Sequence, residues 1–191
     1  YIENAYVLDT MIGGQFDQLY HEHVSYFSVE PVRKFLKRHG MRLISADYAE
    51  LHGGSIMLVA CADSARWVED DSVYQTVLAE RSELFHDVET RFARRAQETV
   101  HHLAAMLTTL AENGKTVDCY GATAKSTTLL NAVVLEATRF RIRQCYDRAP
   151  NKIGKFLPGT GIQIVAEQAM QVAPPDYCLI TAWNYADEIM E

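Results

Sequence analysis

The side chains best suited to chemistry lie in the Tyr-His-Glu-His sequence of residues 20–23. Four consecutive residues there carry hydrogen-bonding or proton-transferring groups, and Ser25 and Tyr26 follow closely. Imidazole titrates nearest to neutral pH, so this segment predicts proton-transfer chemistry. Three interpretations are open: a metal site built on His-x-His, histidines satisfied by backbone groups in a loop, or a general base beside a supporting carboxylate. The metal interpretation needs further ligands, and His39 and His52 lack diagnostic spacing.

A second segment, residues 119–126, predicts a small-residue turn between a strand and a helix. Gly121 and Ala122 allow backbone N–H groups to approach an anion. Lys125 lies in the first turn of the predicted helix, where its ammonium can donate to a phosphate. Asp147 ends the next predicted strand, where dinucleotide folds place an acid against ribose hydroxyls. The glycine pattern matches neither G-x-G-x-x-G nor the P-loop. Ligand binding is favoured over an ordinary turn with a solvated lysine.

A third stretch, residues 152–161, is rich in lysine and small residues. It contains Lys152, Lys155, Pro158 and Gly159, and it either closes over a diphosphate or forms an ordinary exposed loop.

The composition is that of a globular protein. The chain has 191 residues, 48% hydrophobic and 23% charged, with a formal net charge of −7. That charge argues against nucleic acid or an anionic membrane as the main partner. No apolar run is long enough to span a bilayer and no signal-peptide pattern opens the chain, so a cytoplasmic location is expected. The missing initiator methionine suggests a segment of a longer protein.

The four cysteines are widely spaced, with no C-x-x-C pair, and three of them lie in apolar, strand-like runs. Buried free thiols are therefore expected in preference to disulfides or a zinc site.

Periodicity predicts the elements that carry these segments. Residues 1–28 are expected to be rich in loops, with a turn at Gly13-Gly14. A helix follows, capped by Ser28 and ended by His39-Gly40, with Val32, Phe35 and Leu36 on its apolar face. Two runs, 41–47 and 55–61, predict an antiparallel pair around the turn at residues 52–54. Residues 67–112 contain no proline or glycine and predict a long helix that connects or dimerises, with Phe85 and Val88 on its apolar face.

The remainder alternates between strands and a helix, which points to a small parallel α/β sheet. Strands are expected at 117–120, 142–146 and 176–182, with a helix at 124–135. Ligands bind at the carboxyl ends of such strands, where Gly121, Asp147 and Asn184 all fall.

Residues 16–28 resemble the F-D-x-I-Y-H-E-H-x-S-Y-F-S sequence of S-adenosylmethionine-dependent nucleotide-sugar C-methyltransferases. Shorter matches follow in the same order, and they span nearly the whole chain: Gly53-Gly54-Ser55, Tyr120-Gly121-Ala122-x-Ala124-Lys125, Thr128-Leu129-Leu130-Asn131, Asp147 with Lys152, Pro158-Gly159-Thr160, and Trp183-Asn184 with Glu188-Ile189.

The resemblance implies an enzyme that methylates a carbon of a nucleotide-linked keto-deoxysugar, with a thymidine diphosphate sugar as the expected substrate. It implies the tail of a class I methyltransferase domain at 1–62, a helical connector at 63–114 and a Rossmann-like nucleotide-sugar domain at 115–191. It makes His23 the candidate base, Glu22 its orienting partner and Tyr20 the third catalytic residue.

The implied substrate-binding residues extend from the motif into the later sheet. They are His21, Tyr26, Tyr120, Gly121, Ala122, Lys125, Asp147, Lys152, Pro158, Gly159 and Asn184, with no metal ligand and with a homodimer as a further expectation.

The chain also departs from the family pattern. The amino-terminal zinc module and the glycine-rich S-adenosylmethionine loop are absent, so the donor is expected to bind mostly outside this chain. Ser126 replaces a frequent glycine, and Gly161-Ile162-Gln163 replaces the usual H-I-P. Two alternatives stay open: a non-catalytic nucleotide-sugar-binding or dimerisation module, and an NAD-dependent oxidoreductase domain.

Overall fold

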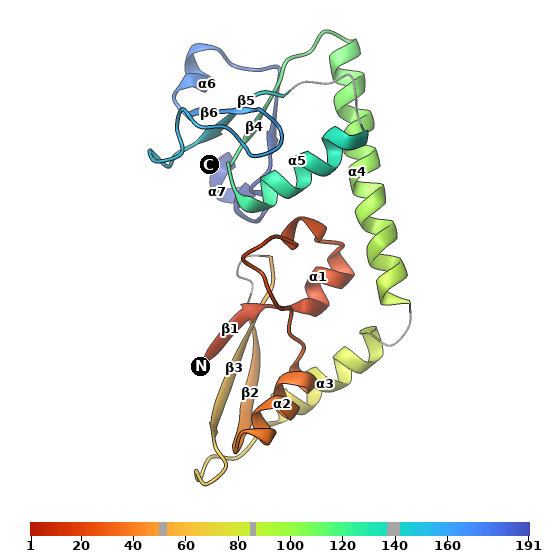
Figure 1. Cartoon of the computed structure of the whole chain (residues 1–191), viewed down its shortest axis with the longest axis vertical. Helices are drawn as coiled ribbons and strands as arrows, with labels where there is room; N and C mark the ends of the chain where they lie inside the picture. The colour runs from red at the N-terminus through yellow and green to blue at the C-terminus, as the bar shows by residue number, and fades with distance from the viewer. Residues whose placement is uncertain (50–52, 85–86, 137–141) are drawn as a thin grey trace. The chain divides into compact units, whose positions relative to one another are not determined.

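A computed structural model describes residues 1–49, 53–84, 87–136 and 142–191 (Figure 1). The chain forms two compact units. The first contains residues 1–15 and 22–95, and the second contains residues 16–21 and 96–191. The predicted α/β class is confirmed. The predicted domain boundaries at residues 62 and 114 differ from the boundaries of these units, and the predicted domains stay a prediction.

The first unit contains a three-stranded antiparallel sheet in the order β1-β3-β2. The strands are β1 (Ile2–Ala5), β2 (Met41–Ala49) and β3 (Ser55–Ala62), and β3 pairs with both neighbours. The predicted antiparallel pair is therefore confirmed. His52, in the predicted turn between its strands, lies outside the described residues.

The expectation of a loop-rich start was wrong. Besides β1, the segment contains α1 (Val7–Gly13) and the 3-10 turn η1 (Phe16–Gln18). The Gly13-Gly14 signal marks a helix end, because Gly14 adopts φ 65° and its N–H caps the last carbonyls of α1. A seven-residue helix is too short to show a clear apolar period in the sequence.

Helix α2 (Val29–Arg38) begins as predicted after Ser28, and His39 caps its carboxyl end. The Ser28 side chain makes no capping hydrogen bond. Instead the carboxylate of Glu80, which is almost fully buried, accepts from the backbone N–H groups of Val29 at 2.6 Å and Glu30 at 3.3 Å. The apolar face was also misassigned at one position, because Phe35 is 59% exposed.

Glu80 belongs to α3 (Asp71–Leu84), which is followed by α4 (Val88–Glu112). The long helix is confirmed as α4, but the predicted helix from residue 67 divides into these two. Phe85, expected on its apolar face, lies outside the described residues. Within the described part of the chain, no helix combines the length and apolarity needed to cross a membrane.

The second unit contains a parallel four-stranded sheet in the order β6-β5-β4-β7. Figure 1 labels the first three of these strands. Strands β4 (Val117–Tyr120) and β5 (Ile142–Asp147) match the predicted runs, and β7 (Tyr177–Ile180) is shorter than predicted. Strand β6 (Gln163–Ala166) and the short elements α6 (Ala169–Val172), η2 (Trp183–Tyr185) and α7 (Ala186–Met190) were not predicted.

One core holds this sheet to its helices. Apolar side chains of α4 and of α5 (Ala124–Glu136) pack against one face of β4, β5 and β6; examples are Leu107, Leu130 and Cys119. At the position of β4 before Cys119, the Asp118 side chain is fully buried and accepts a bidentate pair of hydrogen bonds from Arg143 at 2.8 and 2.9 Å. Alternation along β4 thus separates an apolar layer from a polar one.

The cysteines are free, but their burial differs from the expectation. Cys119 and Cys145 are buried on neighbouring strands, whereas Cys61 is half-buried and Cys178 is exposed. The prediction that the thiols are buried is therefore correct for two of the four. The hydrogen bond with the neighbouring Cys145 thiol, together with burial, raises the pKa of the Cys119 thiol, so that thiol stays protonated at neutral pH.

Candidate functional site

A cleft of about 350 Å³ opens at the carboxyl edge of the parallel sheet. Its lining includes three predicted residues: Tyr120, Gly121 and Asp147. The cleft therefore lies where ligands bind in open parallel sheets. Sequence reasoning missed other lining residues, which come from the β4–α5 turn, the end of β5 and the unpredicted η2 and α7: Thr123, Arg148, Ala182, Tyr185, Glu188 and Ile189.

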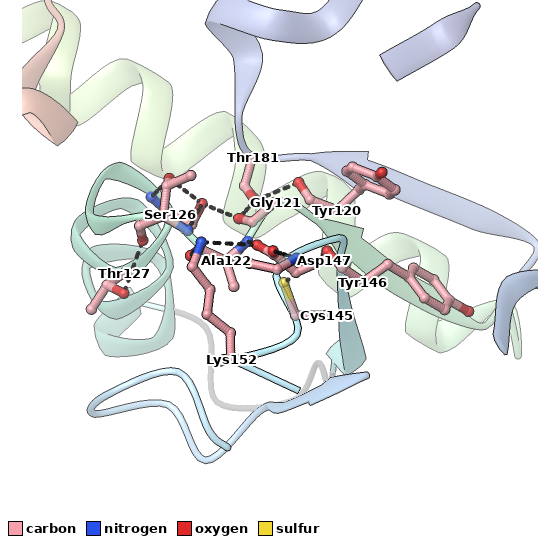
Figure 2. A network of polar contacts seen from close by, with 12 residues as sticks. Tyr120, Gly121, Ala122, Ser126, Thr127, Cys145, Tyr146, Asp147, Lys152 and Thr181 are labelled. Atoms are coloured by element: carbon pink, nitrogen blue, oxygen red, sulfur yellow. Dashed lines mark hydrogen bonds and ion pairs between the residues drawn. The ribbon is translucent and has the colours of Figure 1, made fainter. Parts of the chain in front are cut away.

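Gly121 permits the close approach of two strand ends. It adopts φ 98°, and a Cβ on it would come within 2.5 Å of the Ala182 Cβ. The Thr181 hydroxyl lies 2.9 Å from the carbonyl oxygens of both Tyr120 and Gly121 (Figure 2). The residues that directly follow β7 therefore contact the β4–α5 turn.

Asp147 acts on this turn from β5. Its Oδ2 accepts from the Ala122 N–H at 2.8 Å and from the Lys152 ammonium at 3.2 Å, and its Oδ1 accepts from the Ala149 N–H at 2.8 Å. The Lys152 ammonium also donates to the Ala122 carbonyl at 2.9 Å (Figure 2). Asp147, the predicted ribose ligand, and Lys152, the predicted diphosphate ligand, thus form an ion pair with each other, and both bond to the backbone of Ala122.

Ser126, a departure from the family pattern, is part of the same turn. Its fully buried hydroxyl bonds to the Gly121 carbonyl and lies 2.7 Å from the Thr123 hydroxyl. The Thr123 Oγ1 in turn accepts from the Ser126 N–H at 3.1 Å. This reciprocal arrangement satisfies groups that a helix start leaves without partners.

The Lys125 side chain lies against Trp183, which in turn bonds to Asp17. Its ammonium lies 4.8 Å from the centre of the Trp183 ring, and its side chain is almost buried. The Trp183 Nε1 donates to the Asp17 carboxylate at 2.6 Å. Burial lowers the pKa of Lys125, and the charge of Asp17 opposes that shift.

Three other predicted ligand residues of this unit, Pro158, Gly159 and Asn184, do not line the cleft. Pro158 lies in a loop beside α5, and its carbonyl accepts from the side chain of Asn131 at 2.9 Å. Asn131 is about two turns from the start of α5. Gly159 has φ 77°, and a Cβ there would meet Asn131 at 2.2 Å. Asn184 lies half-buried in η2.

A second cleft, of about 400 Å³, shares Tyr120, Arg148 and Ile189 with the first. Glu167 joins Tyr120 and Arg148, because its Oε2 accepts from the Tyr120 hydroxyl and from the Arg148 guanidinium, both at 2.7 Å. Burial and the bond to Glu167 raise the pKa of Tyr120, while the Tyr120 and Arg148 bonds lower that of Glu167. Arg148 supplies a cation at the edge of both clefts.

The residues of the Tyr-His-Glu-His segment are divided between the two units. Tyr20 and His21 belong to the second unit, and Glu22, His23 and Tyr26 belong to the first. The His23 and Tyr26 rings lie edge to face with centroids 6.2 Å apart, and burial raises the pKa of Tyr26. Across residues 1–49, 53–84, 87–136 and 142–191, no three His, Cys, Asp or Glu side chains gather as a metal site would require.

The parallel sheet and its carboxyl-edge cleft define an α/β protein. Residues 50–191 match the family model of the C-methyltransferase C-terminal domain, and the chain belongs to this C-methyltransferase family. It is also similar to C-methyltransferase NovU from Streptomyces niveus, with 34% identity over 193 residues. That match covers 100% of this chain and 46% of the relative, so the chain spans about half the length of the curated protein.

Proposed function

We propose that this chain is the carboxyl-terminal portion of an S-adenosylmethionine-dependent C-methyltransferase acting on a nucleotide-linked keto-deoxysugar. Family membership and the name of the relative support carbon methylation. The observation that carries the nucleotide-sugar part is the cleft at the carboxyl edge of the parallel sheet, which Gly121 and Asp147 help to line. Residues 1–62, 63–114 and 115–191 are proposed as methyltransferase tail, connector and nucleotide-sugar domain.

The chemistry requires a base, because the carbon beside a ketone is a weak acid. We assign His23 as the base and Glu22 as the carboxylate that orients it. Removing the proton leaves an enolate, whose oxygen needs a hydrogen-bond donor. Tyr20, with His21 or Tyr26, is the proposed donor.

S-adenosylmethionine supplies an electrophilic methyl group to the enolate carbon. The glycine pairs described in the first unit do not form a strand-to-helix turn of the kind that binds such donors. Gly14 closes α1, and Gly54 leads into β3. The donor-binding loop is therefore proposed to lie mostly outside this chain, and no residue here is assigned to it.

The nucleotide part of the substrate is assigned to the cleft of the second unit. Tyr120 and Arg148 offer a hydroxyl and a guanidinium, and the small Gly121-Ala122 turn gives access to the backbone. Thymidine diphosphate is the proposed nucleotide. Lys152 supports this site through the turn, since its ammonium already bonds to Ala122 and Asp147.

The test uses the full-length protein and follows exchange of the substrate α-proton with solvent deuterium. His23→Ala is expected to reduce exchange and turnover by about 10²–10⁴-fold, the usual contribution of a general base. His101→Ala, on the exposed face of α4, is the matched control and is expected to keep both rates. Retained exchange in His23→Ala would exclude His23 as the base.

A calorimetric titration separates the alternatives. Thymidine diphosphate or its sugars are expected to bind, whereas NAD is not. Binding without any α-proton exchange or methyl transfer in the wild-type protein would favour a non-catalytic nucleotide-sugar module, and binding of NAD would favour an oxidoreductase.

A further inference from the structure

We infer that Trp183 is a positioning residue for the proposed methylation, holding the segment of residues 16–20 in place through Asp17. This inference rests on the proposed function, because Tyr20 at the end of that segment is a proposed donor to the enolate.

The contact between Trp183 and Asp17 joins residues 166 positions apart in the sequence. The indole N–H donates to the Asp17 Oδ2 at 2.6 Å, and Asp17 is only 5% exposed. A buried carboxylate needs donors to replace water, and bonds to an ionised acceptor are stronger than neutral ones. Indole is a donor only, so its one N–H is committed to this bond.

Lys125 completes the cluster from the start of α5. Its ammonium lies 4.8 Å from the centre of the Trp183 ring, the geometry of a cation–π contact. We name Asp17, Lys125 and Trp183 the Trp183 cluster. It contains a cation, an aromatic ring and an anion from three separate segments, so it ties η1 both to α5 and to η2.

The backbone transmits this fixation from Asp17 to Tyr20. Within and after η1, the Leu19 N–H donates to the Phe16 carbonyl at 3.0 Å, and the Tyr20 N–H donates to the Gln18 carbonyl at 3.1 Å. Gln18 is 1% exposed, and Phe16 packs against the core of the second unit. A displacement of Asp17 therefore moves the Tyr20 backbone with it.

The same strand end also shapes the cleft. Ala182, one residue before Trp183, abuts Gly121 and lines the cleft, and Tyr185, two residues after it, lines the cleft as well. One short stretch thus forms part of the proposed nucleotide site and holds the segment that presents Tyr20. This placement is why we assign Trp183 a role in positioning, besides its role in packing.

The experiment compares Trp183→Phe and Asp17→Asn in the full-length protein. Trp183→Phe keeps the ring and removes the N–H donor, and Asp17→Asn keeps the shape and removes the charge. The matched control is Trp67→Phe, since Trp67 is 69% exposed and lies in the first unit. Two quantities are measured: hydrogen exchange of the Leu19 and Tyr20 amides, and kcat and KM for the nucleotide sugar.

Both variants are expected to speed exchange of these two amides at least about tenfold, because loss of the anchor allows local opening. They are expected to lower kcat by roughly 10–100-fold while KM changes little, as misplacement of a reacting group does. The control is expected to change neither quantity.

Three outcomes would overturn the inference. The first is unchanged protection of Leu19 and Tyr20 in both variants. The second is faster exchange with kcat equal to that of the control. The third is loss of protection throughout β4 and β5 in both variants, which would make the contact a general stability element. A wild-type protein without methyl transfer would instead refute the proposed function, and the exchange data would still decide whether Trp183 holds the segment.

Discussion

The Cβ of Ala182 lies 2.5 Å from the position that a Cβ on Gly121 would occupy. This approach brings the ends of β7 and β4 together at the cleft, and glycine at residue 121 is what permits it. The position also has φ 98°, a conformation that side-chain-bearing residues rarely adopt.

Gly121→Ala is therefore expected to destabilise the protein by about 2–4 kcal/mol, combining backbone strain with overpacking. Gly154→Ala is the matched control, because Gly154 has φ 83° but nothing within 4 Å of its Cβ position. It is expected to cost only the strain, about 1 kcal/mol. Urea unfolding of both variants measures the difference. Equal losses of unfolding free energy in the two variants would show that Ala182 moves aside without destabilising the protein.

Asp147→Asn tests the polar support of the β4–α5 turn. An amide cannot accept on both sides, so it loses either the Ala122 and Lys152 bonds or the Ala149 bond. The expected loss of unfolding free energy is about 1–3 kcal/mol, together with weaker thymidine diphosphate binding. Asp63→Asn, at an exposed acid of the first unit, is the control and is expected to stay near zero. Normal stability and binding in Asp147→Asn would contradict a supporting role.

Glu80→Gln tests which residue caps α2. The Glu80 carboxylate accepts from the Val29 N–H at 2.6 Å and from the Tyr6 hydroxyl at 3.1 Å, and Tyr6 is itself buried. Replacing this carboxylate by a neutral amide is expected to lower the free energy of unfolding by about 1–3 kcal/mol. Ser28→Ala is expected to cost less than about 0.5 kcal/mol, because the Ser28 side chain makes no capping bond. The reverse order of these two losses in thermal or urea unfolding would restore Ser28 as the cap.

Asp176 predicts a specific acid dependence of stability. The backbone N–H and the hydroxyl of Thr116, together with Lys115, lower the pKa of Asp176 to about 2. A lowered folded-state pKa stabilises the protein above the unfolded pKa of about 3.9, and this contribution is lost as the pH falls through the folded value. The difference in unfolding free energy between wild type and Asp176→Asn is therefore expected to be constant above about pH 5 and to shrink toward pH 2. A difference independent of pH in this window would contradict the assignment.

The sequence predicted most of the elements that carry the cleft. Residues 117–120 and 142–146 have the short apolar pattern of buried strands, and both runs are strands in the structure. The turn at Gly121 and the strand-end position of Asp147 were also predicted, because glycine and strand length are local signals. Strand β6 and helices α6 and α7 escaped prediction, since elements of four or five residues are too short to show a period.

What the sequence determined alone is the α/β class and the antiparallel pair, since these depend on residue types and their spacing. The proton-transfer role of residues 20–23 stays a prediction. The tertiary structure decided which partners each polar group uses. Lys152 pairs with Asp147, Glu80 caps α2, and Trp183 binds Asp17. Such pairings join residues up to 166 positions apart. Hydrogen bonds depend on distances of about 3 Å and on donor direction, which local sequence does not specify and only the folded chain provides.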